Sequence, residues 1–223
     1  WLILLVLNKY YYFMKEDKLT IISRRILRPS LGKSKIALKR ATKYKDIMVS
    51  NGIKARLGLF ISGELNGSIQ LTAAYPNMTD ATKSFVELSK NKEIIDLMDK
   101  REDDPAGHLI GPEVYRSVYG QPSPEHNIIL IREYEVDRKF LSQSIEILTE
   151  ADALAKDEYT NVLALYPIIA DKMDTLYVVY YYSSFESMGD IIDRIGMSKE
   201  FQNLVSKANE TGKLKASNVV KII

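Results

Sequence analysis

Two kinds of hydrophobic pattern alternate along the chain. Short runs rich in β-branched residues, such as 19–27 and 127–136, predict strands. Residues 32–52 instead place apolar side chains every three or four positions, which predicts an amphipathic helix ending near Gly52. The runs 55–63 and 67–75 flank a short polar turn and predict two paired strands. The first half therefore begins with a strand, a helix and two further strands.

A second helix and a last strand complete each half. The helix is expected to start after Asn77 in the first half and after Ser184 in the second, since both residue types cap helices. Its expected buried face contains Phe85, Leu88, Ile95 and Leu97, or in the second half Ile191, Ile195, Phe201 and Leu204. The last strands are predicted at 112–119 and 217–223. Each half thus reads β-α-β-β-α-β.

The two halves are related by a constant offset. A shift of 107 positions places residues 68–100 on 175–207 without a gap, and apolar positions coincide although few residues are identical. We therefore expect two repeats, 18–120 and 125–223, joined by a linker that contains two prolines and a glycine. Residues 1–17 form an N-terminal extension to the first repeat.

This element order is that of a ferredoxin-like unit, in which helices cover one face of a four-stranded antiparallel sheet. The other face is also apolar here and has to be buried. We predict an α+β fold: a tandem duplication of the β-α-β-β-α-β unit, with two four-stranded antiparallel sheets packed as an α/β barrel. Nearly the whole chain after Met14 resembles the dimeric α/β-barrel superfamily, which includes antibiotic-biosynthesis-monooxygenase-like, stress-responsive barrel and NIPSNAP-like proteins. The resemblance is architectural and transfers no activity.

Composition limits the classes of function. The 223 residues carry 31 basic and 29 acidic side chains, so no strong field attracts a nucleic acid and no nucleic-acid partner is expected. The absence of cysteine excludes disulfides, zinc–thiolate sites and thiol nucleophiles. No metal-ligand spacing is recognisable, and we expect neither a metal nor a cofactor. Some tandem members of the superfamily bind haem through a histidine of the second repeat, but residues 127–223 contain no histidine.

The N-terminal segment has two interpretations. Its apolar run, Trp1–Leu7, is much shorter than the roughly 20 residues of a membrane helix. Residues 1–13 are either upstream sequence read in frame, with Met14 as the natural start, or an apolar anchor. Because the segment is a poor signal peptide, we expect a cytoplasmic protein without a membrane partner.

Four tyrosines occur within six positions of the second repeat. Tyr177 and Tyr181 are expected on one face of a strand, and Tyr180 and Tyr182 on the other. They are either sheet packing or the wall of a ligand pocket that also includes Tyr75. The first repeat has Thr72, Ala73 and Ala74 at the corresponding place, which leaves room for one asymmetric pocket.

The candidate polar site residues are two arginines and one histidine. Arg25 and Arg132 occupy equivalent positions in the first strands and either pair with acidic residues or hold a carboxylate or enolate at the barrel mouth. His108 lies in an acidic, Pro/Gly-rich segment, where Asp103 or Asp104 could orient its ring for general base catalysis. The alternative is a surface histidine.

These observations leave two functions open. The first is a small-molecule enzyme: a cofactor-independent oxygenase, cyclase or isomerase that acts on an aromatic or polyketide-like substrate inside the barrel. The second is a non-catalytic barrel that binds a small ligand or builds a homo-oligomer. A pocket of several hundred Å³ with convergent polar groups favours the first function, and a solidly packed interior favours the second.

Overall fold

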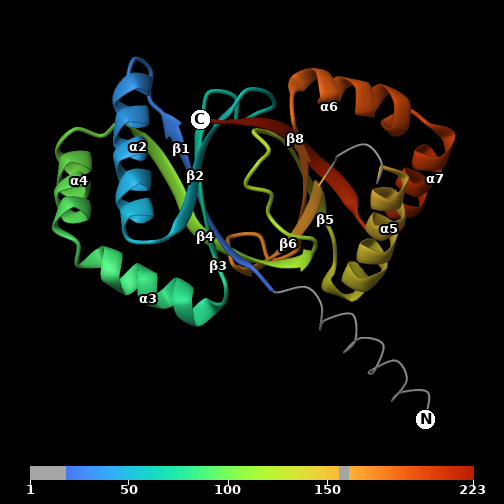
Figure 1. Ribbon diagram of the computed structural model, residues 1–223, viewed down its shortest axis with the longest axis horizontal. Helices are drawn as coiled ribbons and strands as arrows, with labels where there is room; N and C mark the ends of the chain where they lie inside the picture. Colours follow the sequence, from blue (N-terminus) through green and yellow to red (C-terminus); the bar gives the residue numbers. More distant parts are fainter. Residues whose placement is uncertain (1–18, 156–160) are drawn as a thin grey trace, which may run out of the picture.

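The computed structural model describes residues 19–155 and 161–223, so the N-terminal extension 1–17 lies outside the described residues. The first half contains β1 (Ile21–Pro29), α2 (Ser34–Ser50), β2 (Lys54–Phe60), β3 (Ile69–Tyr75), α3 (Met78–Ser89), α4 (Lys92–Asp103) and β4 (Gly107–Tyr119). The second half contains β5 (Ile128–Glu135), a 3-10 turn η1 (Arg138–Phe140), α5 (Leu141–Leu154), β6 (Asn161–Ile169), β7 (Thr175–Tyr182), α6 (Phe185–Ile191), a π-helical turn η2 (Ile192–Gly196), α7 (Lys199–Ala208) and β8 (Lys213–Ile222). Figure 1 shows the strands at the centre with helices on both flanks.

The strands form one closed antiparallel barrel in the order β1-β3-β2-β8-β5-β7-β6-β4. Each half contributes four neighbouring strands, β4-β1-β3-β2 and β8-β5-β7-β6, so the strand order of the two halves is the same. The halves meet where β2 pairs with β8 and where β4 pairs with β6. Closure leaves none of the strands in this barrel with an unpaired edge. The predicted α+β barrel architecture is confirmed.

The strands bury both of their faces, as the sequence predicted. On the outer face, α2, α3 and α4 cover the strands of the first half, and α5, α6 and α7 cover those of the second (Figure 1). The inner face carries a separate apolar cluster that includes Ile22, Phe60, Ile129 and Leu163. Strand β7 shows the alternation directly, because Tyr177, Val179 and Tyr181 belong to the inner cluster while Val178 and Tyr180 pack against helices.

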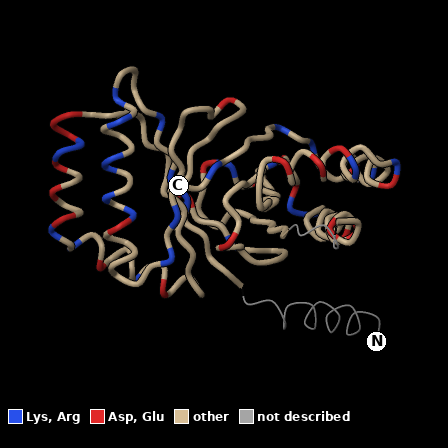
Figure 2. The backbone as a smooth tube through the Cα atoms, turned by 45° about the horizontal axis from the view of Figure 1, so that its top comes forward, with Lys and Arg blue, Asp and Glu red and all other residues tan. Residues whose placement is uncertain are grey.

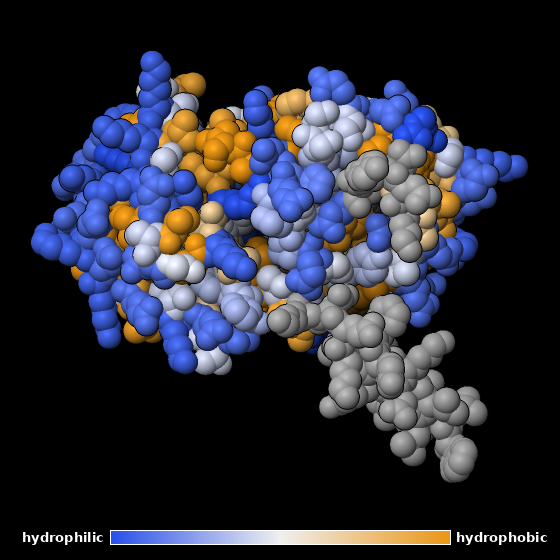
Figure 3. Space-filling model, in the orientation of Figure 1, coloured by the Kyte–Doolittle hydropathy of each residue, from blue (hydrophilic) through white to orange (hydrophobic). Residues whose placement is uncertain are grey.

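The outer helices carry the polar surface. Acidic and basic residues both occur along them (Figure 2). Hydrophilic residues cover most of the face drawn in Figure 3, interrupted by patches of hydrophobic residues. Within the described part of the chain, no helix is long and apolar enough to cross a membrane.

The expected second helix of the first half is in fact two helices. Asn77 caps α3 as predicted, but the Asn91 side chain accepts hydrogen bonds from the backbone N–H groups of Glu93 and Ile94 and starts α4. The break resets the helical phase. Phe85 and Ile95 are therefore exposed, at 57% and 44%, which corrects the expectation that both are buried.

The last strand of the first half is longer than predicted and corrects the expected loop around His108. β4 begins at Gly107, and His108 pairs with Arg28 of β1. Gly107 permits this pairing, because a Cβ atom there would lie 2.2 Å from the Arg28 carbonyl oxygen. His108 is a strand residue with an exposed side chain.

Candidate functional site

The interior of the barrel contains a cavity of about 710 Å³. Apolar and aromatic side chains from both halves form most of its wall, among them Ile22, Ala74, Ile129, Leu163, Tyr177 and Tyr181. Thr72, Ala73 and Ala74 line it, which confirms that the small residues of β3 leave an open volume. A cavity of this size and character is typical of a binding site for a small molecule.

Arg24, Tyr115 and Tyr177 line this cavity, and Glu113 holds Arg24 without being a lining residue itself; we call these four residues the cavity floor. Arg24 Nη2 donates to Glu113 Oε2 at 2.7 Å, to the Tyr115 hydroxyl at 2.8 Å and to the Tyr177 hydroxyl at 3.0 Å. The Tyr115 hydroxyl donates to the same Glu113 oxygen at 2.7 Å. The floor is thus a connected polar network inside an apolar barrel.

Aromatic contacts hold the guanidinium group in place. The Cζ atom of Arg24 lies 4.4 Å from the Tyr177 ring centroid and 5.0 Å from that of Tyr115. The two rings meet edge to face, with centroids 5.1 Å apart. Because the Arg24 and Glu113 side chains are only 11% and 12% exposed, the ion pair is almost fully removed from solvent.

Protonation at the floor is set by competing effects. Burial works to raise the pKa of Glu113, but the Arg24 charge and the hydrogen bonds from Arg24 and Tyr115 hold this pKa below its usual range. Burial raises the pKa of Tyr115 far above that of a free tyrosine, with Arg24 opposing the shift. Burial would also lower the pKa of Arg24, yet the two tyrosines and Glu113 outweigh it and raise this pKa. At neutral pH the floor therefore holds a guanidinium, a carboxylate and the protonated Tyr115 phenol.

Strand register explains why these residues meet. Arg24 of β1 lies directly opposite Glu113 of β4 and Thr72 of β3, so the arginine and its carboxylate partner share the inner face. An irregularity in the β1–β4 pairing between Arg24 and Ile26 bends the strands at this point.

The rim of the cavity is formed by the segment between the halves, the residues just before β2 and the first residues of that strand, which include Lys54 and Arg56. Arg56 Nη1 donates to the Ser123 carbonyl at 2.7 Å, and its Nη2 donates to the His126 carbonyl at 2.6 Å and to Asn127 Oδ1 at 3.1 Å. The Ser123 hydroxyl and His126 Nδ1 share a hydrogen bond at 2.5 Å. Arg56 therefore anchors the predicted linker to β2 beside the cavity.

Tyr181 connects this rim to the cavity wall. Burial raises its pKa to about 12, while Arg56 and a hydrogen bond from the Ser123 backbone work in the opposite direction. Among the predicted pocket tyrosines, Tyr181 lines the central cavity. Tyr75, Tyr180 and Tyr182 instead belong to clusters that pack between the sheet and the helices.

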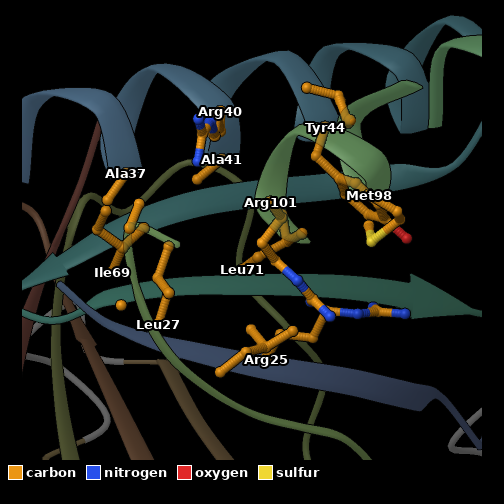
Figure 4. Close-up of a pocket in the computed structure, with 14 residues that line it drawn as sticks. Arg25, Leu27, Ala37, Arg40, Ala41, Tyr44, Ile69, Leu71, Met98 and Arg101 are labelled. Carbon is orange, nitrogen blue, oxygen red and sulfur yellow. The ribbon is translucent and has the colours of Figure 1, made fainter. Parts of the chain in front are cut away.

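The two predicted arginines do not face the barrel interior, which corrects their expected placement at its mouth. Arg25 lines a cleft of about 110 Å³ between β1, β3 and the helices α2 and α4 (Figure 4). Arg132 lines the corresponding cleft of the second half, of about 70 Å³, beside Tyr180. Alternation along β1 is the reason, because Arg24 and Arg25 necessarily point to opposite faces.

The cleft beside Arg25 is a smaller alternative site. Figure 4 shows Arg40, Arg101 and Tyr44 around an apolar wall that includes Leu71. Arg40 is occupied, since its guanidinium pairs with Asp104 at 3.0 Å. The volume is about one sixth of that of the central cavity, and we take the central cavity as the candidate site.

His108 and its expected carboxylate partner are not brought together. Asp104 pairs with Lys33 at 2.7 Å and with Arg40, and His108 is exposed on β4 away from the cavity wall. Nothing in this arrangement orients the imidazole for base catalysis. In the ranges 19–155 and 161–223, no cluster of His, Cys, Asp or Glu side chains is suited to a metal ion.

The sequence interpretation missed Arg24, Arg56, Glu113 and Gln70. The signal for Arg24 was present, since Arg24 lies one position from Arg25 and alternation assigns the two to opposite faces. Alternation alone does not say which of the two faces of β1 lines the interior of the barrel. The positions of Arg56 and Gln70 follow from the register of β2 and β3, in which Arg56 lies opposite Thr72 and Gly58 lies opposite Gln70.

Comparison with known proteins identifies the fold. No protein-family model and no curated protein sequence matches the chain. An anthrone oxidase-like protein of known structure superposes with a TM-score of 0.66 at 10% identity, over 93% of this chain and 92% of the other. A Fusobacterium nucleatum protein called "Putative monooxygenase" gives 0.62 at 10% identity over 92% of each chain. A protein called "Putative Chlorite dismutase" gives 0.60 at 10% identity over 93% and 96%. At this identity the similarity shows a shared α+β barrel fold alone.

Proposed function

We propose that the protein binds a small, largely apolar molecule in its central cavity. The observation that carries this proposal is the cavity of about 710 Å³, walled mostly by apolar and aromatic side chains and by one polar cluster. Protein interiors are otherwise close-packed, and a void of this size inside a single barrel requires an occupant or a function.

The chemistry that the floor supports best is hydrogen-bond donation to a neutral ligand oxygen, including the partial negative charge that a carbonyl oxygen gains as an enolate begins to form. Glu113 and two aromatic rings fix the position of Arg24, which lines the cavity. A group that stabilises an oxyanion has to be held in place in this way before the reaction begins. A cofactor-independent oxygenase, cyclase or isomerase reaction passes through such an enolate. The structural similarity to proteins named as monooxygenases and as anthrone oxidase-like is consistent with this reaction class.

A non-catalytic binding protein is the second candidate, and one observation favours it. The described wall of the cavity contains no Asp, Glu or His, so it offers no ordinary base for proton abstraction. The distinction can be measured with 2-tetralone, whose acidic C–H exchanges with deuterium when an enolate forms. Accelerated exchange that requires Arg24 supports catalysis, whereas tight binding without acceleration supports the binding protein.

The binding site itself is tested by filling the cavity. Ala74→Phe places a ring inside the barrel, and Val86→Phe places the same ring on the exposed surface of α3 as a control. We expect the first variant to lose binding of the neutral fluorophore N-phenyl-1-naphthylamine and the second to retain it. Equal binding by both variants would contradict the assignment of the site to the barrel interior.

We also propose that the halves 18–120 and 125–223 are copies of one ancestral unit. The support comes from the two clefts between sheet and helices. Arg25 and Arg132, which differ by 107 positions, line equivalent clefts. The same offset relates Leu71 to Val178, Leu97 to Leu204 and Ala41 to Leu148 in their walls. Separate expression of the two halves, followed by measurement of their association, tests whether each is a folding unit.

A further inference from the structure

Gln70 is a buried amide without a partner. It lines the central cavity, is 5% exposed, and makes no side-chain hydrogen bond to any described residue. Its Oε1 atom is a buried acceptor to which no residue in 19–155 or 161–223 donates. Such a group is destabilising and rare in folded proteins, so it indicates a function or a bound molecule.

Gln70 lies beside the cavity floor. On β3 it projects to the same face as Thr72, which is opposite Arg24, and Gln70 itself is opposite Ile26. The Gln70 and Arg24 side chains are therefore diagonal neighbours on the inner face of the β1–β3 pair. A half-turn about the terminal torsion of the glutamine exchanges its oxygen and its nitrogen, so either atom can face a ligand.

The floor also has unused hydrogen-bond donors. Arg24 engages its partners through Nε and Nη2, and its Nη1 has no partner among the described residues. The Tyr177 hydroxyl accepts from Arg24, and within the same residues its own proton is not donated to any acceptor. A ligand oxygen at the floor would thus find donors from Arg24, Tyr177 and the Gln70 amide.

The charge of the floor selects among ligands. Arg24 is already neutralised by Glu113 at 2.7 Å, and the other cationic residues in the wall, Lys54 and Arg56, belong to the rim. A ligand carboxylate at the floor would leave two carboxylates sharing one guanidinium in a poorly solvated place. A neutral carbonyl oxygen takes the same donors without that cost.

Resting on the proposed binding function, we propose that the cavity recognises a neutral, planar molecule through a cis-amide-like edge, in which a hydrogen-bond donor is adjacent to a carbonyl oxygen. The carbonyl accepts from Arg24, Tyr177 and the Gln70 nitrogen. The adjacent donor satisfies the Gln70 oxygen, which nothing else in the described wall does. The remaining surface of the molecule is apolar and contacts the barrel wall.

Three bicyclic probes of similar size separate the possibilities. 2-Quinolone has both the N–H and the carbonyl, coumarin replaces the N–H by oxygen, and 2-naphthoate carries a carboxylate. We expect 2-quinolone to bind about tenfold more tightly than coumarin, because coumarin leaves the Gln70 acceptor without a donor. We expect 2-naphthoate to bind more weakly than either, as measured by titration calorimetry.

Each outcome has a definite meaning. Equal affinity for 2-quinolone and coumarin, or tightest binding of 2-naphthoate, would overturn the recognition edge and leave the binding function standing. Failure of all three probes and of N-phenyl-1-naphthylamine would overturn the binding function and this inference with it. The wild-type series gives these answers without any variant.

Two variants then locate the effect. Gln70→Met removes the amide and should abolish the preference for 2-quinolone over coumarin while coumarin binding persists. Asn218→Leu removes a second buried amide with an unpartnered oxygen that is not part of the described cavity wall, and it should leave the preference unchanged. A preference that survives Gln70→Met would contradict the assignment of Gln70.

Discussion

Arg24 Nη2 lies 2.7 Å from Glu113 Oε2, and the two residues occupy directly opposed positions on β1 and β4. Both side chains are almost entirely buried, so the pair is attractive only while both partners are present. The stability of the barrel therefore depends on the same ion pair that forms part of the cavity floor.

Removal of one partner should be far more harmful than removal of both. Arg24→Met leaves the Glu113 carboxylate buried without its cation and is expected to lower the free energy of unfolding by about 3–5 kcal/mol. The double variant Arg24→Met/Glu113→Leu should recover most of this loss, because no uncompensated charge remains. Urea unfolding measures both values. Equal stability of the single and double variants would show that the pair is not energetically coupled.

Acid should weaken the protein through Glu113. The pKa of Glu113 is lower in the folded protein than the ordinary value near 4.5. Between the folded pKa and 4.5, the unfolded state binds a proton that the folded state does not bind, and this difference favours unfolding. The stability contributed by Glu113 is present above pH 4.5 and is lost as the pH falls through the folded pKa. Glu113→Gln should therefore show a flatter decline in unfolding free energy below pH 4.5. Parallel curves for the two proteins would contradict this cause.

Alkali should act through Tyr181. Burial raises its pKa from 10.0 to about 12, so between these values the unfolded state has released a proton that the folded state still holds. Stability falls with rising pH across this window. Tyr181→Phe removes the titrating group and should reduce the slope of unfolding free energy against pH between 10 and 12. An unchanged slope would mean that Tyr181 ionises in the folded state as freely as in the unfolded state.

Arg56 should control the order of the segment between the halves. Its three hydrogen bonds to Ser123, His126 and Asn127 tie this segment to β2. Arg56→Met is expected to cost about 2 kcal/mol and to speed amide hydrogen exchange at residues 121–127. Arg28→Met, which removes an exposed pair with Glu64 at 3.7 Å, is the control and should change stability by less than about 0.5 kcal/mol.

The barrel could be predicted because its evidence is periodic. Strand and helix patterns recur at one offset, and a sheet that is apolar on both faces requires a second sheet. Helix interruptions were harder to predict, since Asn91 begins a new helix through a side-chain cap that has no effect on the apolar pattern before it. The same limit applies to His108, whose neighbours resemble a loop but pair with β1.

The site residues were harder to predict from the sequence than the fold was, and for a different reason. In β1 both faces carry apolar residues and an arginine, so alternation separates Arg24 from Arg25 without saying which one faces the interior. Glu113 and Gln70 are distant from Arg24 in the chain and reach it only through strand register. Register across a closed barrel depends on all eight strands together and has no local sequence signal.

A crystal structure of the protein soaked with 2-quinolone tests the central claim most directly. We expect the ligand inside the barrel, with its carbonyl oxygen within hydrogen-bond distance of Arg24 and Tyr177 and its N–H directed at Gln70. Binding in the cleft beside Arg25, with the central cavity empty, would contradict the account.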